Sequence, residues 1–243
     1  MNDERPCTAV LLPGTGSDDT FVRAVFAAPL TARRIRLVTP APRPGAELAT
    51  AYLAALDAAA ADGPVLAGGI SFGAHLAASW AVANPARCAG LLLALPGWHG
   101  DAGEGARAPA ALAARYSAAR IRAVGLAAAL DAATRDVPAW LAAELTRTWS
   151  RYGGALAESL ELAADHPAPT LADLATLAVP VGVAACTDDP VHPLAAARSW
   201  AAAIPGAVLA TTTLTALGAD RTALGDAAVA AWSAALGDGE GAT

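Results

Sequence analysis

The residues most suited to chemistry form a Gly-x-Ser-x-Gly sequence, Gly69-Ile-Ser71-Phe-Gly73, between an apolar run and an Ala-rich stretch. A nucleophilic serine must sit on a sharp strand-to-helix turn, where its backbone is strained and the residues two positions away must be small. The run from Val65 to Ile70 predicts the strand, and the stretch from Phe72 to Ala83 predicts the helix. The pattern therefore favours a nucleophile elbow at Ser71 over an ordinary turn with a surface serine.

The elements around this elbow alternate along the chain. Short β-branched or Leu-rich runs are separated by longer Ala-rich stretches, which is the pattern of a parallel sheet with helices in its crossovers. Strands are expected at Thr8 to Leu12, Ile35 to Thr39, Val65 to Ile70, Cys88 to Leu95, Val179 to Ala185 and Ala207 to Leu214. Helices are expected at Thr20 to Leu30, Ala46 to Ala61, Phe72 to Ala83, Leu194 to Ile204 and Thr222 to Leu236. The sequence thus predicts an α/β fold with a mostly parallel sheet of about six strands and helices on both faces.

The alternation stops once, after Leu95, where a long stretch contains no convincing strand but has Leu, Trp and Ala at helical spacing. Pro138, Gly153-Gly154 and His166-Pro167 divide this stretch into three or four expected helices. We therefore expect a core formed by residues 1–97 and 177–243, with a helical insertion over residues 98–176.

The order of strand, elbow and helix resembles the α/β-hydrolase superfamily, and the similarity in layout extends over nearly the whole chain. This resemblance implies a serine hydrolase with the insertion as a helical cap over its active site. The segment from Leu11 to Ser17 lies where the family carries its oxyanion loop, with Pro13 in place of the usual His. The backbone N–H groups of Thr15 and Phe72 are the expected oxyanion donors. Alternatively, the same segment is only a polar turn that leads into the next helix.

The acid expected from the resemblance lies after the fifth predicted strand. The sequence Cys186-Thr-Asp188-Asp189-Pro190 is similar to the family's Gly-x-x-Asp-Pro, with Cys186 in the Gly position. This register selects Asp189 to orient an imidazole, and Asp188 is the fallback. Alternatively, both aspartates only open the turn before the helix that Pro193 starts.

The base is the point at which the sequence departs from the family. The family places its His after the last strand, whereas residues 211–225 contain no His and have Asp220 near that position. The leading expectation is therefore an incomplete triad, with His99 and His192 as the two alternatives for the base. The remaining histidines, His75 and His166, are expected to have structural roles.

The composition limits the classes of partner and cofactor that we expect. Sixteen basic residues against 22 acidic ones give a net charge of −6, which argues against nucleic acid as a partner. Without a signal sequence or a long apolar window, we expect a cytoplasmic protein with no membrane partner. The three cysteines, Cys7, Cys88 and Cys186, lack metal-ligand spacing, so no metal or other cofactor is predicted.

These observations lead to one favoured function and one main alternative. The favoured function is hydrolysis of an ester, thioester or related acyl bond of a small apolar substrate, with Ser71 as nucleophile and a weak or unconventional base. The alternative is a non-catalytic pseudo-hydrolase that binds a small ligand or a protein partner, because the expected His is missing. A lyase or acyltransferase is a lesser alternative, and the sequence leaves the oligomeric state open.

Overall fold

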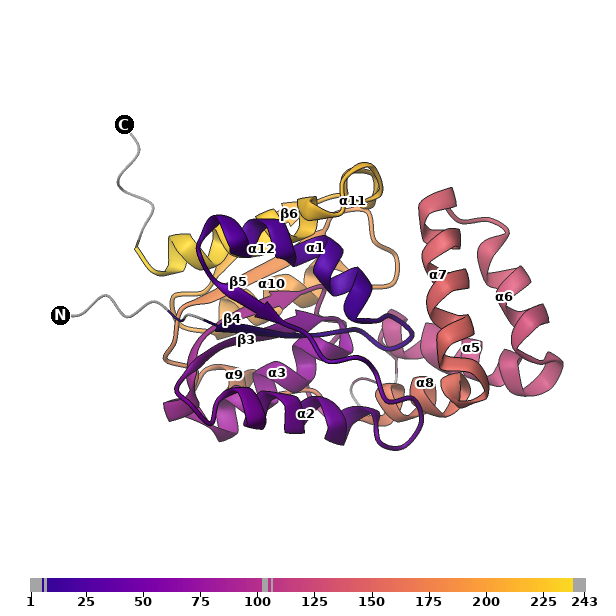
Figure 1. Ribbon diagram of the computed structural model, residues 1–243, viewed down its shortest axis with the longest axis horizontal. Coiled ribbons are helices and arrows are strands. Elements are labelled where there is room, and N and C mark those ends of the chain that lie inside the picture. The colour runs from indigo at the N-terminus through magenta and orange to yellow at the C-terminus, as the bar shows by residue number, and fades with distance from the viewer. Residues whose placement is uncertain (1–5, 7, 102–104, 106, 238–243) are drawn as a thin grey trace.

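A parallel sheet of six strands lies at the centre of the computed structural model, which describes residue 6, residues 8–101, residue 105 and residues 107–237 (Figure 1). The strand order is β2-β1-β3-β4-β5-β6, and every neighbouring pair is parallel. The strands are β1 (Thr8–Leu12), β2 (Arg36–Val38), β3 (Val65–Ile70), β4 (Cys88–Ala94), β5 (Val181–Cys186) and β6 (Val208–Thr212). The expected α/β class with a parallel six-stranded sheet is confirmed.

Helices cover both faces of the sheet, because the residues of its central strands are buried on both sides. On one face, α1 (Asp19–Ala32) and α12 (Thr222–Ala235) pack against residues such as Leu11 and Leu92. On the other face, α2 (Leu48–Ala59), α3 (Phe72–Ala83) and α10 (Leu194–Ala203) pack against the intervening residues, such as Leu12 and Leu93. The carboxyl ends of the central strands are therefore held between two apolar layers.

A group of helices connects β4 to β5 and gathers at one end of the molecule, apart from the sheet (Figure 1). The helices gathered there are α5 (Pro109–Val124), α6 (Leu126–Thr134), α7 (Ala139–Tyr152) and α8 (Leu156–Asp165). The short α9 (Leu171–Leu174) follows them in the chain but lies beside α3 and contacts α10 (Figure 1). The breaks expected at Pro138, Gly153 and His166 coincide with helix ends. Gly125 makes a further break, at φ +82°, a conformation that glycine adopts without steric cost.

The end of the chain differs from expectation at one place. β6 ends at Thr212, and α11 (Leu214–Ala219) replaces the predicted last residues of the strand. Thr213 begins this helix, because its side chain accepts a hydrogen bond from the backbone N–H of Ala216. The segment after β6 is thus a helix that begins with a capping threonine.

Two further observations concern the cysteines and the apolar character of the helices. Cys88 and Cys186 are buried free thiols, while Cys7 lies outside the described residues. Within the described ranges, no helix combines the length and the apolar character needed to cross a membrane.

Candidate active site

Ser71 stands at the junction of β3 and α3 in a strained conformation, with φ +54° and ψ −117°. Its backbone N–H donates to the carbonyl of Ala94 at 2.9 Å, which ties the turn to β4. A Cβ at Gly73 would lie 2.2 Å from the backbone oxygen of Leu12, and a Cβ at Gly69 would lie 2.5 Å from the same atom. Only glycine fits at either position, so the two glycines permit the turn that the sequence predicts at Ser71.

The imidazole of His192 lies between Ser71 and Asp189. The Ser71 hydroxyl is 2.9 Å from Nε2 of His192, and Nδ1 of the same ring is 2.9 Å from Oδ2 of Asp189. Ser71 and His192 are 121 positions apart in the sequence, whereas the acid and the imidazole share the short connection between β5 and α10. The fold thus links a hydroxyl, an imidazole and a carboxylate through two hydrogen bonds.

Asp189 fixes both the position and the tautomer of this imidazole. Its Oδ1 accepts hydrogen bonds from the backbone N–H groups of Val191 at 2.7 Å and His192 at 3.0 Å. Burial alone would raise the pKa of Asp189, but its hydrogen bonds with His192 and Val191 bring the pKa below the ordinary value. An ionised carboxylate can only accept, so Nδ1 carries a proton and Nε2 accepts the hydrogen bond from Ser71. This is the protonation pattern in which an imidazole can act as a base toward serine.

The connection after β5 explains which aspartate faces the imidazole. Asp188 is exposed and accepts a hydrogen bond at 2.6 Å from the backbone N–H of Leu214, at the start of α11. Asp189 faces inward, as the Asp-Pro register predicts. Asp188 therefore ties α11 to this connection and does not contact His192.

Two expectations about the base are wrong. The prediction of an incomplete triad fails because His192 reaches Ser71 from the connection after β5, where the family's acid lies, instead of from the segment after β6. Asp220 does not occupy the place of an imidazole, because it is exposed and accepts hydrogen bonds from the N–H and hydroxyl of Thr222 at the start of α12. The other alternative for the base, His99, is half-buried and does not line the cavity around Ser71.

His75 has the structural role expected of it. Its Nε2 accepts a hydrogen bond from the backbone N–H of Gly97 at 3.0 Å, and its ring packs between Trp98 and Trp200. Burial lowers the pKa of His75 to about 3, so the ring is neutral. This histidine supports the wall beneath Trp98.

A cavity of about 600 Å³ opens at Ser71 and His192. Both residues expected to supply oxyanion donors, Thr15 and Phe72, line it. The turn that carries Thr15 lies directly against the elbow, because a Cβ at Gly14 would be 3.4 Å from the Cβ of Ser71. The wall opposite the sheet comes from α5, α6, α7 and α8, whose residues there are mainly alanine, leucine and tryptophan. A mostly apolar chamber of this size fits a medium-sized ligand.

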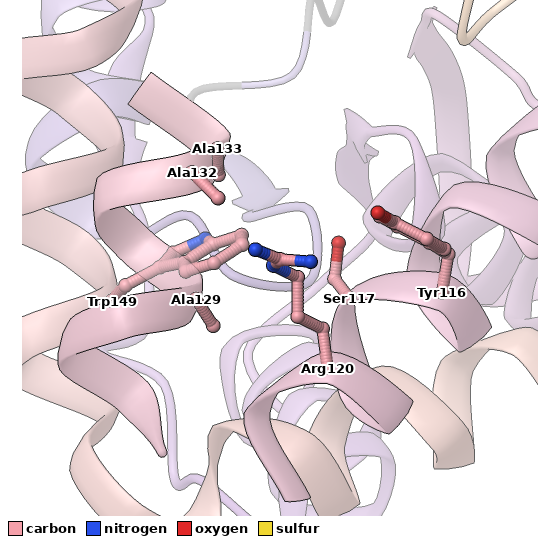
Figure 2. Close-up of a pocket in the computed structure, with 7 residues that line it drawn as sticks. All are labelled: Tyr116, Ser117, Arg120, Ala129, Ala132, Ala133 and Trp149. Atoms are coloured by element: carbon pink, nitrogen blue, oxygen red, sulfur yellow. The ribbon is translucent and has the colours of Figure 1, made fainter. Parts of the chain in front are cut away.

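A second, much smaller hollow of about 80 Å³ lies between α5, α6 and α7 (Figure 2). Ser117, Ala133 and Trp149 line both this hollow and the large cavity, so they form a wall common to the two. The guanidinium of Arg120 reaches into the hollow between Ser117 and Trp149 (Figure 2). Because neither Ser71 nor His192 lines it, the hollow is not the candidate active site.

Helix α7 is fastened to the loop after β1 by a buried carboxylate. Asp18 caps α1 by accepting a hydrogen bond from the backbone N–H of Phe21. Its carboxylate also accepts hydrogen bonds from Arg147, at 3.0 Å to Oδ1, and from Arg151, at 2.9 Å to Oδ2. Burial would raise the pKa of Asp18, but the hydrogen bonds from Arg147, Phe21 and Arg151 lower it, so the side chain is ionised. The hydroxyl of Tyr152 donates to the carbonyl of Ser17 beside this group. These bonds hold α7 over the cavity.

Comparison with solved structures identifies the architecture. A bromoperoxidase from Bacillus anthracis superposes with a TM-score of 0.71 at 16% identity, covering 94% of this chain and 92% of that one. MenH from S. aureus gives 0.69 at 16% identity, over 96% and 95% of the two chains. A thermophilic esterase from Thermogutta terrifontis gives 0.66 at 20% identity, over 85% and 80%. The sequence matches no protein-family model, and no curated protein is significantly similar to it. The solved structures are α/β-hydrolases, so their similarity shows the fold of this chain.

Proposed function

Because the chain has the α/β-hydrolase fold, we propose that it is a serine hydrolase that cleaves an ester, thioester or related acyl bond of a small, mainly apolar substrate. One observation carries the proposal, namely the continuous hydrogen bonding from Ser71 through His192 to Asp189. The fold is shared by enzymes of several activities, so the argument rests on these three side chains and not on the fold.

The reaction follows from the protonation states of the three groups. His192 Nε2 takes the proton of the Ser71 hydroxyl as its oxygen attacks the substrate carbonyl, and Asp189 stabilises the imidazolium that results. The backbone N–H groups of Phe72 and Thr15 are the donors we assign to the oxyanion of the tetrahedral intermediate. The imidazolium then gives its proton to the leaving alcohol or thiol, and an acyl group remains on Ser71. Attack by water, with His192 again as the base, releases the acid and restores the serine.

The helices between β4 and β5 act as a cap in this proposal. Their apolar side chains form the wall of the cavity that faces Ser71. An apolar acyl group that fills this space excludes water from the reacting carbonyl and is held close to the nucleophile. The Thermogutta terrifontis protein with the same fold is named an esterase, which fits this choice of reaction.

The reason for the non-catalytic alternative is the absence of a His after the last strand. Because the ring of His192 lies 2.9 Å from the Ser71 hydroxyl, that absence no longer argues against a serine hydrolase.

Two matched pairs of variants test the proposal. We expect Ser71→Ala to abolish both hydrolysis of 4-nitrophenyl butyrate and labelling by a fluorophosphonate, whereas Ser199→Ala, on the exposed face of α10, retains both. We expect His192→Ala to lower kcat by about 10⁴-fold to 10⁶-fold, since the members of one catalytic unit are not additive, while His99→Ala stays near the wild-type rate. Equal hydrolysis by wild type and Ser71→Ala, with no labelling of either, would exclude a serine hydrolase.

A further inference from the structure

The charges around the cavity carry an inference about the substrate, which rests on the proposed function. We propose that the cavity discriminates by the sign of charge: it accepts acyl groups that are uncharged or positively charged and rejects those that carry a carboxylate, sulfonate or phosphate. The preference arises in the wall formed by α7 and the turn before it, not in the catalytic residues.

The charged side chains that line the cavity, apart from His192, are all acidic. They are Asp136, in the turn before α7, Glu144, on α7, and Asp189, which is committed to the imidazole. The chain contains no lysine, and within its described part no arginine is among the residues that line the cavity. An anionic group placed in this space would therefore meet carboxylates and no cationic partner.

The two arginines of α7 are paired with carboxylates and do not line the cavity. Arg147 pairs with both Glu144 and Asp18, and Arg151 pairs with Asp18 and Asp19. This group contains three carboxylates and two guanidinium groups, so it keeps one net negative charge beside the cavity. The pairing of Glu144 with Arg147 leaves that net charge unchanged.

Other guanidinium groups near the same helices do not line the cavity either. Arg115 pairs with Asp165 and Arg122 with Glu161, and Arg135, which precedes Asp136, is exposed. Arg221 donates to the carbonyls of Leu217 and Gly218 and lies 4.6 Å above the ring of Trp140. Arg120 reaches into the small outer hollow, on the other side of the wall that contains Trp149 (Figure 2). The cation on Trp140 occupies one ring face, and Trp98 and Trp149 remain as indole walls of the cavity.

Desolvation alone does not explain a preference for one sign of charge. Any ion loses hydration when it enters an apolar cavity, so an apolar wall disfavours cations and anions alike. A cation regains part of this loss from the carboxylates and from the faces of the indole rings, whereas an anion is repelled by both. The sign of the substrate charge is therefore the variable to test.

The test uses three 4-nitrophenyl esters of similar length: hexanoate, 4-(trimethylammonio)butanoate and the mono-ester of adipic acid. At low ionic strength we expect kcat/KM for the cationic ester to exceed that for the anionic ester by roughly tenfold or more. The ratio should fall in 0.5 M NaCl, because salt screens charges near the surface. A ratio near one at low salt would overturn the inference while the Ser71-dependent hydrolysis of the neutral ester upheld the proposed function.

Variants assign the preference to the wall. We expect Asp136→Asn and Glu144→Gln each to lower the cation-to-anion ratio by roughly threefold to tenfold, since each removes one negative charge from the lining. Asp131→Asn, which removes an exposed charge of α6 outside the lining, is the matched control and should leave the ratio unchanged. A ratio that all three variants leave unchanged would show that the discrimination does not come from this wall.

A binding measurement keeps the inference independent of turnover. The Ser71→Ala protein is titrated with hexyltrimethylammonium and with hexanesulfonate, and the fluorescence of the cavity tryptophans reports occupancy. We expect the ammonium ion to bind at least tenfold more tightly at low salt. Equal affinities, or tighter binding of the sulfonate, would refute the charge preference. Because the measurement does not require turnover, this result is independent of whether the protein hydrolyses any ester.

Discussion

Asp189→Asn is the substitution that most directly tests how the site works. The amide oxygen of an asparagine can still accept from the backbone N–H groups of Val191 and His192, as Oδ1 of the carboxylate does. Its NH₂ group, however, would face Nδ1 of His192 where a carboxylate oxygen now lies at 2.9 Å. An NH₂ group can only donate, so the ring must move its proton to Nε2 in order to accept at Nδ1. That tautomer cannot take the proton of Ser71.

The expected size of the effect differs between activity and stability. The wrong tautomer lowers kcat by about 10⁴-fold in serine hydrolases that use the same three groups, and we expect a loss of that order here. The fold exchanges a hydrogen bond to a charged group for a neutral one and keeps the two to the backbone, so the free energy of unfolding should fall by only about 1 kcal/mol. The protein should therefore remain folded and largely inactive.

The pH dependence gives this prediction a second readout. The pKa of Asp189 lies below its ordinary value of 3.8 in the folded protein, so its ionised form stabilises the fold above pH ~4, and this contribution is lost as the pH falls through the lowered pKa. The difference in unfolding free energy between wild type and Asp189→Asn should therefore be largest near neutral pH and shrink below pH ~4.

Hydrolysis of 4-nitrophenyl butyrate gives kcat, and urea unfolding at several pH values gives the free energy. Asp188→Asn, which alters the exposed neighbour, serves as the control and should retain most of kcat. If Asp189→Asn kept more than a tenth of the wild-type kcat, the role of Asp189 in fixing the tautomer would be refuted.

Two further predictions concern the elements that hold the site. Gly73→Ala would place a Cβ 2.2 Å from the backbone oxygen of Leu12 in β1 and should lower the free energy of unfolding by about 3 kcal/mol or more. Gly154→Ala, a control with open space around it, should change the free energy of unfolding by less than about 1 kcal/mol. Thermal unfolding measures both. Asp18→Asn removes the charge that Arg147 and Arg151 share and should lower stability by about 2 kcal/mol while keeping the helix cap; a loss below 0.5 kcal/mol would mean that these ion pairs do not fasten α7.

The framework of the fold could be predicted from the sequence because local patterns determine it. The expected strands Thr8–Leu12 and Val65–Ile70 and the helix Phe72–Ala83 have the same limits in the structure. Each is a run whose periodicity and bounding residues agree with its place in the sheet or on its surface. The break at Gly125 was missed, because an isolated glycine in a helical pattern also occurs within continuous helices.

The base could not be chosen from the sequence for a physical reason. The approach of His192 to Ser71 depends on the path of the chain after β5, which is set by the three hydrogen bonds to Asp189 and not by a local pattern. The residue before Pro193 is restricted to extended backbone, and that restriction alone does not say which way the imidazole points. The spacing of Asp189 and His192, three residues apart after a buried strand, is the signal that would have favoured this histidine over His99.

Because Asp189 and His192 lie on one connection, the hydrogen-bonded pair is a single structural unit. The segment after β6, where the family resemblance predicts the base, contains no histidine and contributes Leu214 and Leu217 to the cavity wall. The length and composition of α11 can therefore be changed without dismantling the pair, provided that Asp188 still meets its first N–H group. A library of α11 sequences on this scaffold would vary the shape of the cavity while Asp189 and His192 keep their positions.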